Sequence, residues 1–299
     1  MSDFDQLNRF LIDRAHVRGQ LVRLQDSLTD IVHSQEYPVQ IQRLLSEMAA
    51  AASMLTATLK FEGEISLQIQ GNGPVNYAVI HATHNQTMRG VARWDQSSPS
   101  LPDVLEALLR QAVLVITITP DKGERYQGVV ALDKPTLAES MESYFAQSEQ
   151  LPTKIMLMTD LRDPEHIKAA GMLLQVLPED ASQSVLASGN DFEHLVKLGE
   201  TLSEEEMFCL PVSEILYRLY HQEEVELFAP QPVKFACTCS KVRTAQALRN
   251  VEKAELLNII AEDGAVNMNC QYCHAEYSFD EIDIEAIHAG NFDSPETPQ

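Results

Sequence analysis

Basic residues are scarce in this sequence. The 299-residue chain has 22 lysines and arginines against 44 aspartates and glutamates, which gives a formal net charge of −22. A protein that binds nucleic acid needs a basic surface that displaces counterions from the phosphates. The charge balance therefore argues against nucleic acid as a partner. It suits a protein that must stay soluble while it exposes apolar surface.

Long apolar runs are also missing. The longest, residues 48–59 and 113–119, fall far short of the roughly 20 residues that span a membrane, and serine or threonine interrupts both. The first six residues, Met-Ser-Asp-Phe-Asp-Gln, are acidic and polar and do not lead into an apolar segment. We therefore expect no membrane span and no signal peptide.

Common catalytic motifs are absent. The sequence has no G-x-x-x-x-G-K-[ST] loop, no G-x-S-x-G elbow and no H-E-x-x-H pair, so it implies neither a nucleotide-driven cycle nor either of these hydrolase chemistries. Gly71 and Gly73 resemble part of a dinucleotide-binding loop. However, they stand between two predicted strands and a third glycine is missing, so a hairpin turn is expected there.

Cysteines are few, but four of the five form two chelating pairs. Cys237 and Cys239 make a C-x-C pair, and Cys270 and Cys273 make a C-x-x-C pair after thirty intervening residues. Two such pairs can supply the four thiolates of a tetrahedral zinc site. The spacing therefore predicts one zinc ion per chain. Because metal-binding thiols must stay reduced and no export signal is seen, a cytoplasmic location is expected.

The first 178 residues are expected to form an α+β core domain of antiparallel hairpins with packed helices. Apolar residues at helical spacing predict a core helix from Pro38 to about residue 59. Thr136, with Glu139 in capping-box register, predicts a second helix to about residue 150. Alternating or apolar runs predict strands within residues 14–24 and at residues 64–70, 75–81, 88–92, 113–119, 125–131 and 155–159.

Residues 179–231 are predicted to be an acidic helical linker. They hold twelve acidic residues against two basic ones, yet apolar positions such as Ile215, Leu216 and Leu219 lie on one helical face. Two interpretations remain open. The segment is either a connector permanently packed on the first domain, or a conditionally folded segment whose apolar faces can be uncovered. Cys209 lies in this linker outside both pairs. We expect a buried thiol there, the alternative being a second redox sensor or an intermolecular disulfide.

Residues 232–299 are predicted to be a small zinc-binding domain. A hairpin over residues 266–279 would carry the second cysteine pair at its tip, with a helix over residues 248–261 and a frayed tail from residue 284. His274 follows the last cysteine, but four thiolates already fill a tetrahedron, so we do not expect it to be a ligand.

Three roles for the cysteines compete. A zinc ribbon for nucleic acid is disfavoured, because residues 232–299 hold five bases against eleven acids. A thiol–disulfide enzyme is disfavoured because its C-x-x-C would open a helix, whereas this pair lies between two strand-like runs. The third role is a redox switch, in which oxidation of the thiolates releases zinc and unfolds a module with too little core of its own. A constitutive zinc-stabilised adaptor for one folded partner is the competing class.

Further segments carry a resemblance to a known family. They are Arg18-Gly19, Tyr37-Pro38, Leu59-Lys-Phe-Glu-Gly63, Gln68-Ile-Gln-Gly-Asn-Gly-Pro74, Met88-Arg-Gly-Val-Ala92, Gly123-Glu-Arg-Tyr-Gln-Gly128, Gly171-Met-Leu-Leu-Gln175 and Leu216-Tyr-Arg-Leu-Tyr-His221. With the C-x-C and C-x-x-C spacing, they make the chain similar, nearly end to end, to the 33 kDa chaperonin family of redox-regulated heat-shock holdases.

The resemblance implies a chaperone and not an enzyme. It implies that Cys237, Cys239, Cys270 and Cys273 ligate zinc in the reduced, inactive protein. It also implies that oxidation pairs Cys237 with Cys239 and Cys270 with Cys273, after which the linker unfolds and the protein tends to form a homodimer. The partners would then be unfolding client proteins, held without ATP, and neither nucleic acid nor membrane.

Overall fold

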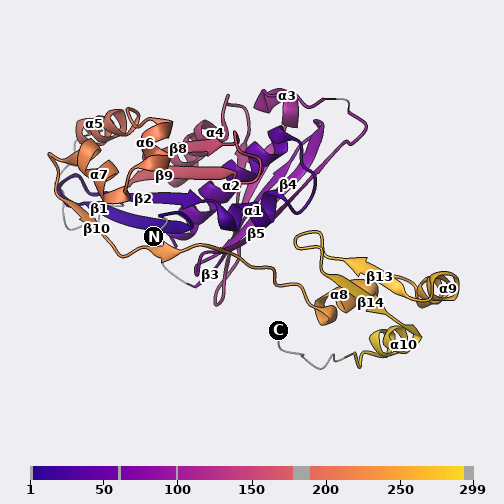
Figure 1. Ribbon diagram of the computed structural model, residues 1–299. Helices are drawn as coiled ribbons and strands as arrows, with labels where there is room; N and C mark the ends of the chain where they lie inside the picture. Colours follow the sequence, from indigo (N-terminus) through magenta and orange to yellow (C-terminus); the bar gives the residue numbers. More distant parts are fainter. Residues whose placement is uncertain (1–2, 60–61, 99, 178–188, 293–299) are drawn as a thin grey trace. The chain divides into compact units, whose positions relative to one another are not determined.

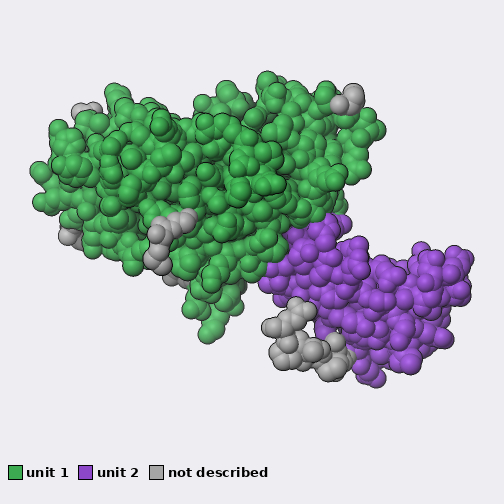
Figure 2. Space-filling view, in the orientation of Figure 1, with its two compact units in different colours: residues 1–236 green, residues 237–299 purple. Residues whose placement is uncertain are grey.

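The computed structural model describes residues 3–59, 62–98, 100–177 and 189–292 (Figure 1). The chain forms two compact units, residues 1–236 and residues 237–299 (Figure 2). Helices and mostly antiparallel strands make up both units, which confirms the predicted α+β class. Among the described residues, no helix combines the length and the apolar character needed to cross a bilayer.

The first unit contains two six-stranded sheets. Sheet A has the order β10-β1-β2-β9-β8, with β11 also paired to β1, and sheet B has the order β12-β5-β4-β3-β6-β7. The strands of sheet A are β1 (Gln6–Ile12), β2 (Val17–Leu24), β8 (Thr153–Asp160), β9 (Lys168–Val176), β10 (Val225–Leu227) and β11 (Gln231–Pro232). Those of sheet B are β3 (Gly63–Gln70), β4 (Val75–Thr83), β5 (Thr87–Trp94), β6 (Val113–Pro120), β7 (Tyr126–Ala131) and β12 (Lys234–Phe235).

Helix α2 (Val39–Thr56) packs against strands of both sheets and forms the centre of the main core. Its small residues, Ala49 to Ala52, are all buried and allow close approach to the strands. The other helices before the linker are α1 (Asp26–Val32), α3 (Leu105–Leu109) and α4 (Leu137–Tyr144), with a short 3₁₀ turn η1 (Asp13–Ala15). The predicted second helix is therefore α4, which continues as one π-helical turn, η2 (Phe145–Glu149). Thr136 caps α4 as predicted, because its side chain accepts a hydrogen bond from the Glu139 N–H.

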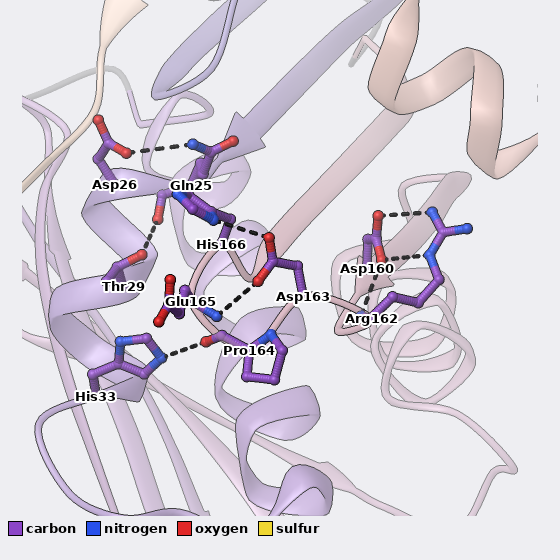
Figure 3. Close-up of polar contacts among 10 residues, drawn as sticks. All are labelled: Gln25, Asp26, Thr29, His33, Asp160, Arg162, Asp163, Pro164, Glu165 and His166. Carbon is purple, nitrogen blue, oxygen red and sulfur yellow. Dashed lines mark hydrogen bonds and ion pairs between the residues drawn. The ribbon is translucent and has the colours of Figure 1, made fainter.

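The turn between β8 and β9 is tied to α1 (Figure 3). Two hydrogen bonds of 2.8 Å join the Arg162 guanidinium to the Asp160 carboxylate and hold the pKa of Asp160 at about 2. His33, just after α1, hydrogen-bonds the Pro164 carbonyl through Nε2 at 2.9 Å. The Arg162–Asp160 pair thus holds the β8–β9 turn together, and the His33 hydrogen bond joins that turn to α1.

Three linker helices cover the other face of sheet A. They are α5 (Gly189–Gly199), α6 (Glu204–Cys209) and α7 (Val212–Tyr220), and their apolar side chains form a second core with that sheet. The Phe10 and Tyr220 rings lie 6.3 Å apart in this core. Gly19, opposite Phe10 in the register, makes room for the ring, since a Cβ there would lie 2.0 Å from Phe10 Cζ. In this structure the linker helices are thus a connector packed on the first unit.

The second unit differs from the prediction in two places. One helix was expected over residues 248–261, but the chain forms α8 (Lys241–Leu248) and α9 (Lys253–Asp263), because residue 252 is extended between them. The break lets Leu248 and Leu256 both reach the same small core.

The tail predicted to fray from residue 284 instead contains α10 (Glu281–Ala289). A capping box between Asp280 and Asp283 starts this helix, and Ile284 and Ile287 bury its apolar side. Residues 293–299 of that predicted tail lie outside the described residues.

The burial of Glu47, on α2, leads to a prediction about how stability depends on pH. Burial raises the pKa of its carboxyl from 4.5 to about 7, although Arg43 partly opposes this shift. The folded protein therefore holds the proton more tightly than the unfolded chain. The stability that this proton contributes is complete below pH 4.5 and is lost as the pH rises through about 7. At pH 8, Glu47→Gln should raise the free energy of unfolding by about 1–2 kcal/mol and flatten the decline between pH 5 and 8.

The measurement is urea unfolding at several pH values, followed by the fluorescence of Trp94, the single tryptophan. Exposed Glu36, changed to Gln, is the matched control and should leave the pH profile unchanged. Parallel profiles for wild type and Glu47→Gln would contradict the assignment.

Candidate metal centre

The four cysteines of the two pairs come from two tight segments of the second unit. Cys239 is followed by Ser240, whose side chain caps α8 by accepting the Arg243 N–H. Cys270 and Cys273 lie in the turn between β13 (Val266–Asn269) and β14 (Glu276–Phe279). This confirms that the C-x-x-C pair stands between two strands and does not open a helix.

The turn that carries Cys270 and Cys273 is closed by backbone hydrogen bonds. The Cys270 N–H donates to the Ala275 carbonyl, and the His274 N–H donates to the Cys270 carbonyl, both at 2.9 Å. His274 has a left-handed backbone, with φ of 57°, at the position that closes the knuckle. Its ring is not part of the cluster of four sulfurs.

The structure brings all four sulfurs together. Every pair of Sγ atoms lies within 4.8 Å, with 3.6 Å between Cys237 and Cys270 and 3.3 Å between Cys239 and Cys273. Sulfurs around a tetrahedral zinc at about 2.3 Å would be separated by about 3.8 Å. These contacts are well beyond the roughly 2.05 Å of a disulfide, and all four residues are free thiols. The donor set therefore fits a soft divalent cation in tetrahedral coordination.

The thiols do not ionise alike. Burial raises the pKa of Cys270, but the N–H groups of Tyr272 and Cys273 and the neighbouring thiols outweigh it and bring the pKa to about 7. Burial and the neighbouring thiols raise the pKa of Cys273 to about 12, and burial also raises that of Cys237. One thiolate thus forms readily and disfavours the next ones. A divalent cation removes this repulsion and lets all four thiols ionise.

Tyr277 belongs to the site although its role was not predicted. Its hydroxyl lies 3.1 Å from Cys239 Sγ and can donate a hydrogen bond to the thiolate. The sequence signal that pointed to this role is its position on β14, only four residues after Cys273. A donor of this kind stabilises the charged ligand and orients it toward a metal.

The core around the thiols is small. Seven buried apolar residues form it: Ala245, Leu248, Leu256, Val266, Phe279, Ile284 and Ile287. Two ion pairs tie α10 to α8 and α9, Lys241–Asp283 at 2.7 Å and Lys253–Glu285 at 2.6 Å. A core of this size leaves a 63-residue unit dependent on a cross-link or a metal for stability.

Cys209 was expected to be buried, and this prediction is wrong. The residue is exposed at the C-terminal end of α6, in the first unit and outside the sulfur cluster. The short helix buries Met207 and Phe208 toward sheet A, and the next position turns toward solvent.

The fold is similar to that of a solved protein, the 33 kDa chaperonin (heat shock protein 33 homolog) of Thermotoga maritima. The two share a TM-score of 0.79 over 96% of this chain and 98% of that one, at 21% sequence identity. At this identity, the likeness establishes the fold alone.

Sequence comparison establishes the family. Residues 5–280 match the family described as Hsp33 protein, and the chain belongs to this family of chaperones. The 33 kDa chaperonin of Pseudoalteromonas atlantica is 60% identical over 289 residues, which cover 97% of each chain. That of Shewanella sp. (strain ANA-3) is 54% identical over 288 residues, covering 95% of this chain and 96% of its own.

The hydrogen bond from Tyr277 generates a prediction. Tyr277→Phe should weaken zinc binding about tenfold, because the Cys239 thiolate loses a donor. Competition with a colorimetric zinc chelator under reducing conditions measures the affinity. Cys209→Ser is the control and should keep both the affinity and one zinc per chain. A loss of zinc in Cys209→Ser, or unchanged affinity in Tyr277→Phe, would show that the ligand environment is different.

Proposed function

We propose that this chaperone is a cytoplasmic, ATP-independent holdase that oxidation switches on. In the reduced state Cys237, Cys239, Cys270 and Cys273 would hold one zinc ion, and the protein would be inactive. Oxidation of the four thiolates to two disulfides would release zinc and unfold the linker. The uncovered protein would then bind unfolding clients and prevent their aggregation. No catalytic residue is assigned.

The linker packed on sheet A is the observation that carries this proposal. Apolar side chains of α5, α6 and α7, among them Leu195, Ile215 and Tyr220, are almost fully buried against this sheet. Their release would expose two complementary apolar surfaces, one on the helices and one on the sheet. Large exposed apolar patches bind other proteins, which is what a holdase requires. The same patches would favour a homodimer of the oxidised form.

Thiolate oxidation supplies the switch. When two thiolates form a disulfide they give two electrons to a peroxide, whose O–O bond breaks to yield two hydroxide ions. Two peroxides would therefore convert the four thiolates into two disulfides and remove every zinc ligand. A structural zinc contributes on the order of 10–16 kcal/mol to small modules. The seven-residue core of the second unit cannot replace that contribution.

The chain path supports transmission to the linker. After α7, the chain crosses the first unit as β10, β11 and β12, and the Ala236 N–H donates to the Met88 carbonyl at 3.0 Å. Cys237 is the next residue. The Lys154 ammonium also anchors Glu200, at the end of α5, with a 3.0 Å ion pair. Unfolding of the thiol unit would free one end of this stretch, and the apolar contacts on sheet A together with this ion pair would then have to hold the linker without that end.

The direct test is the aggregation of a heat-denatured client at fixed chaperone concentration. Protein pretreated with peroxide at elevated temperature should suppress the light scattering, whereas reduced, zinc-loaded protein should not. Equal protection by both forms would rule out the switch. Saturable binding of one folded partner that is lost on oxidation would instead support a constitutive adaptor.

The disulfide pairing can be checked in the same oxidised sample. Trypsin can cut between the two pairs, at Lys241, Arg243, Arg249 and Lys253. Pairing of Cys237 with Cys239 and of Cys270 with Cys273 should therefore leave two unlinked peptides in a mass spectrum. A linked peptide would contradict this pairing and mean that the disulfides join the two segments, whose sulfurs lie 3.3 and 3.6 Å apart.

Two tyrosines on α7 give a matched pair of variants. Tyr220 is 1% exposed and packs on Phe10, while Tyr217 is 71% exposed on the same helix. Tyr220→Ala should weaken linker docking by about 3–5 kcal/mol and produce holdase activity in the reduced, zinc-loaded protein. Tyr217→Ala should remain inactive until oxidised. If limited proteolysis shows a released linker in Tyr220→Ala but no activity follows, the covered face is not the client surface.

A further inference from the structure

A cavity of about 400 Å³ lies at one end of the main core, away from the linker helices. Its apolar walls come from sheet B and the end of α2, and include Ile65, Ile116, Ile118 and Leu55. Leu151, just after η2, closes another side. Volume and apolar lining are those of a site for a small ligand and not of a packing defect.

Arg18 lines this cavity without a carboxylate partner. Its Nε and Nη2 donate to the Gln175 side-chain oxygen, and its Nη1 makes a long 3.5 Å bond to the Thr58 carbonyl. These bonds use three of the five guanidinium N–H groups, which leaves two without an acceptor among the described residues. No described carboxylate forms an ion pair with Arg18, and burial lowers its pKa. A partly buried guanidinium with free N–H groups and no ion-pair partner is stabilised by an anion.

Other polar residues of the cavity lining already hydrogen-bond one another. The Glu149 carboxylate accepts hydrogen bonds from the Tyr126 and Tyr144 hydroxyls, at 2.9 and 3.0 Å. Gly128 makes this arrangement possible, because a Cβ there would lie 2.0 Å from the Tyr144 hydroxyl oxygen. Glu149 and Glu124 both line the cavity and would repel a multiply charged anion. Arg18 is the only cationic residue of the lining, so a carboxylate would bind at its guanidinium and away from these two glutamates.

Residues far apart in the chain meet at this cavity: Arg18 from β2, Glu124 and Tyr126 from the β6–β7 hairpin, and Gln175 from β9. Arg18 lies on the same face of β2 as Val22, and Gln175 lies on the same face of β9 as Leu173. Both of these faces point into the main core. The linker helices cover the other face of those strands. The cavity is therefore separate from the proposed client surface.

We propose that this cavity binds a monocarboxylate with an apolar body, such as a medium-chain fatty acid. The carboxylate would take the two remaining N–H groups of Arg18, and the hydrocarbon chain would lie along the isoleucines of sheet B. Guanidinium–carboxylate pairs are strong in partly buried sites, and the apolar walls would exclude water from the chain. This proposal does not depend on the redox switch.

Octanoate is the probe, titrated calorimetrically into the reduced, zinc-loaded full-length protein. We expect one saturable site per chain with a Kd between about 10 μM and 1 mM. Octylammonium and octanol, which have the same chain length but lack the negative charge, should bind at least about tenfold more weakly. Methyl NMR should show shifts at Ile65, Ile116 and Ile118 on addition of octanoate.

Two variants locate the site. Arg18→Gln should weaken octanoate binding at least about tenfold, whereas Arg14→Gln, at an exposed arginine on η1, should leave it unchanged. Leu151→Trp should fill the cavity and abolish binding while Arg18 is kept, so it decides the question even if Arg18→Gln does not fold. Octanoate binding that survives both Arg18→Gln and Leu151→Trp would overturn the proposal. So would octanol binding as tight as octanoate, or no saturation up to about 5 mM.

Discussion

Sheet A is apolar on both faces, and the rest of the first unit is built around this constraint. In β9, Ala169 and Leu173 point into the α2 core while Ala170, Met172 and Leu174 point toward the linker helices. A sheet with two apolar faces needs a cover on each side, because either face left in water costs about 25 cal/mol per Å². Helix α2 is central to one core. The other cover is a segment that continues in sequence toward the thiol unit.

The proposed function makes the second cover the one that is released. Helices α5 to α7 are amphipathic and bury their apolar side against sheet A, so most of their stability comes from docking. In the proposed mechanism the second unit depends on its four sulfurs in a similar way, since only seven of its described apolar side chains are buried in its core. The linker and the thiol unit follow each other in the chain. The proposed function requires that a chemical event at the thiols has a structural effect on the linker.

The two proposed kinds of binding would lie on different faces of sheet A. The linker face is broad and apolar and would accept clients of many sequences. The α2 face ends in a small cavity with one unpaired guanidinium, which suits a defined small anion. The two proposed sites share strands β2 and β9. A ligand in the cavity would pack between the sheets without competing with a client.

Local patterns determined much of this protein in advance. Helical spacing predicted α2, alternating or apolar runs predicted most strands of sheet B, and the two cysteine pairs predicted the sulfur cluster, because each signal lies within a few neighbouring residues. β9 was not predicted as a strand, since a strand buried on both faces loses its alternation. The helix break between α8 and α9, the docked α10 and the exposure of Cys209 depend on which face meets a core formed by distant residues. The Tyr277–Cys239 and Arg18–Gln175 hydrogen bonds likewise join residues 38 and 157 positions apart, and only the tertiary structure brings such pairs together.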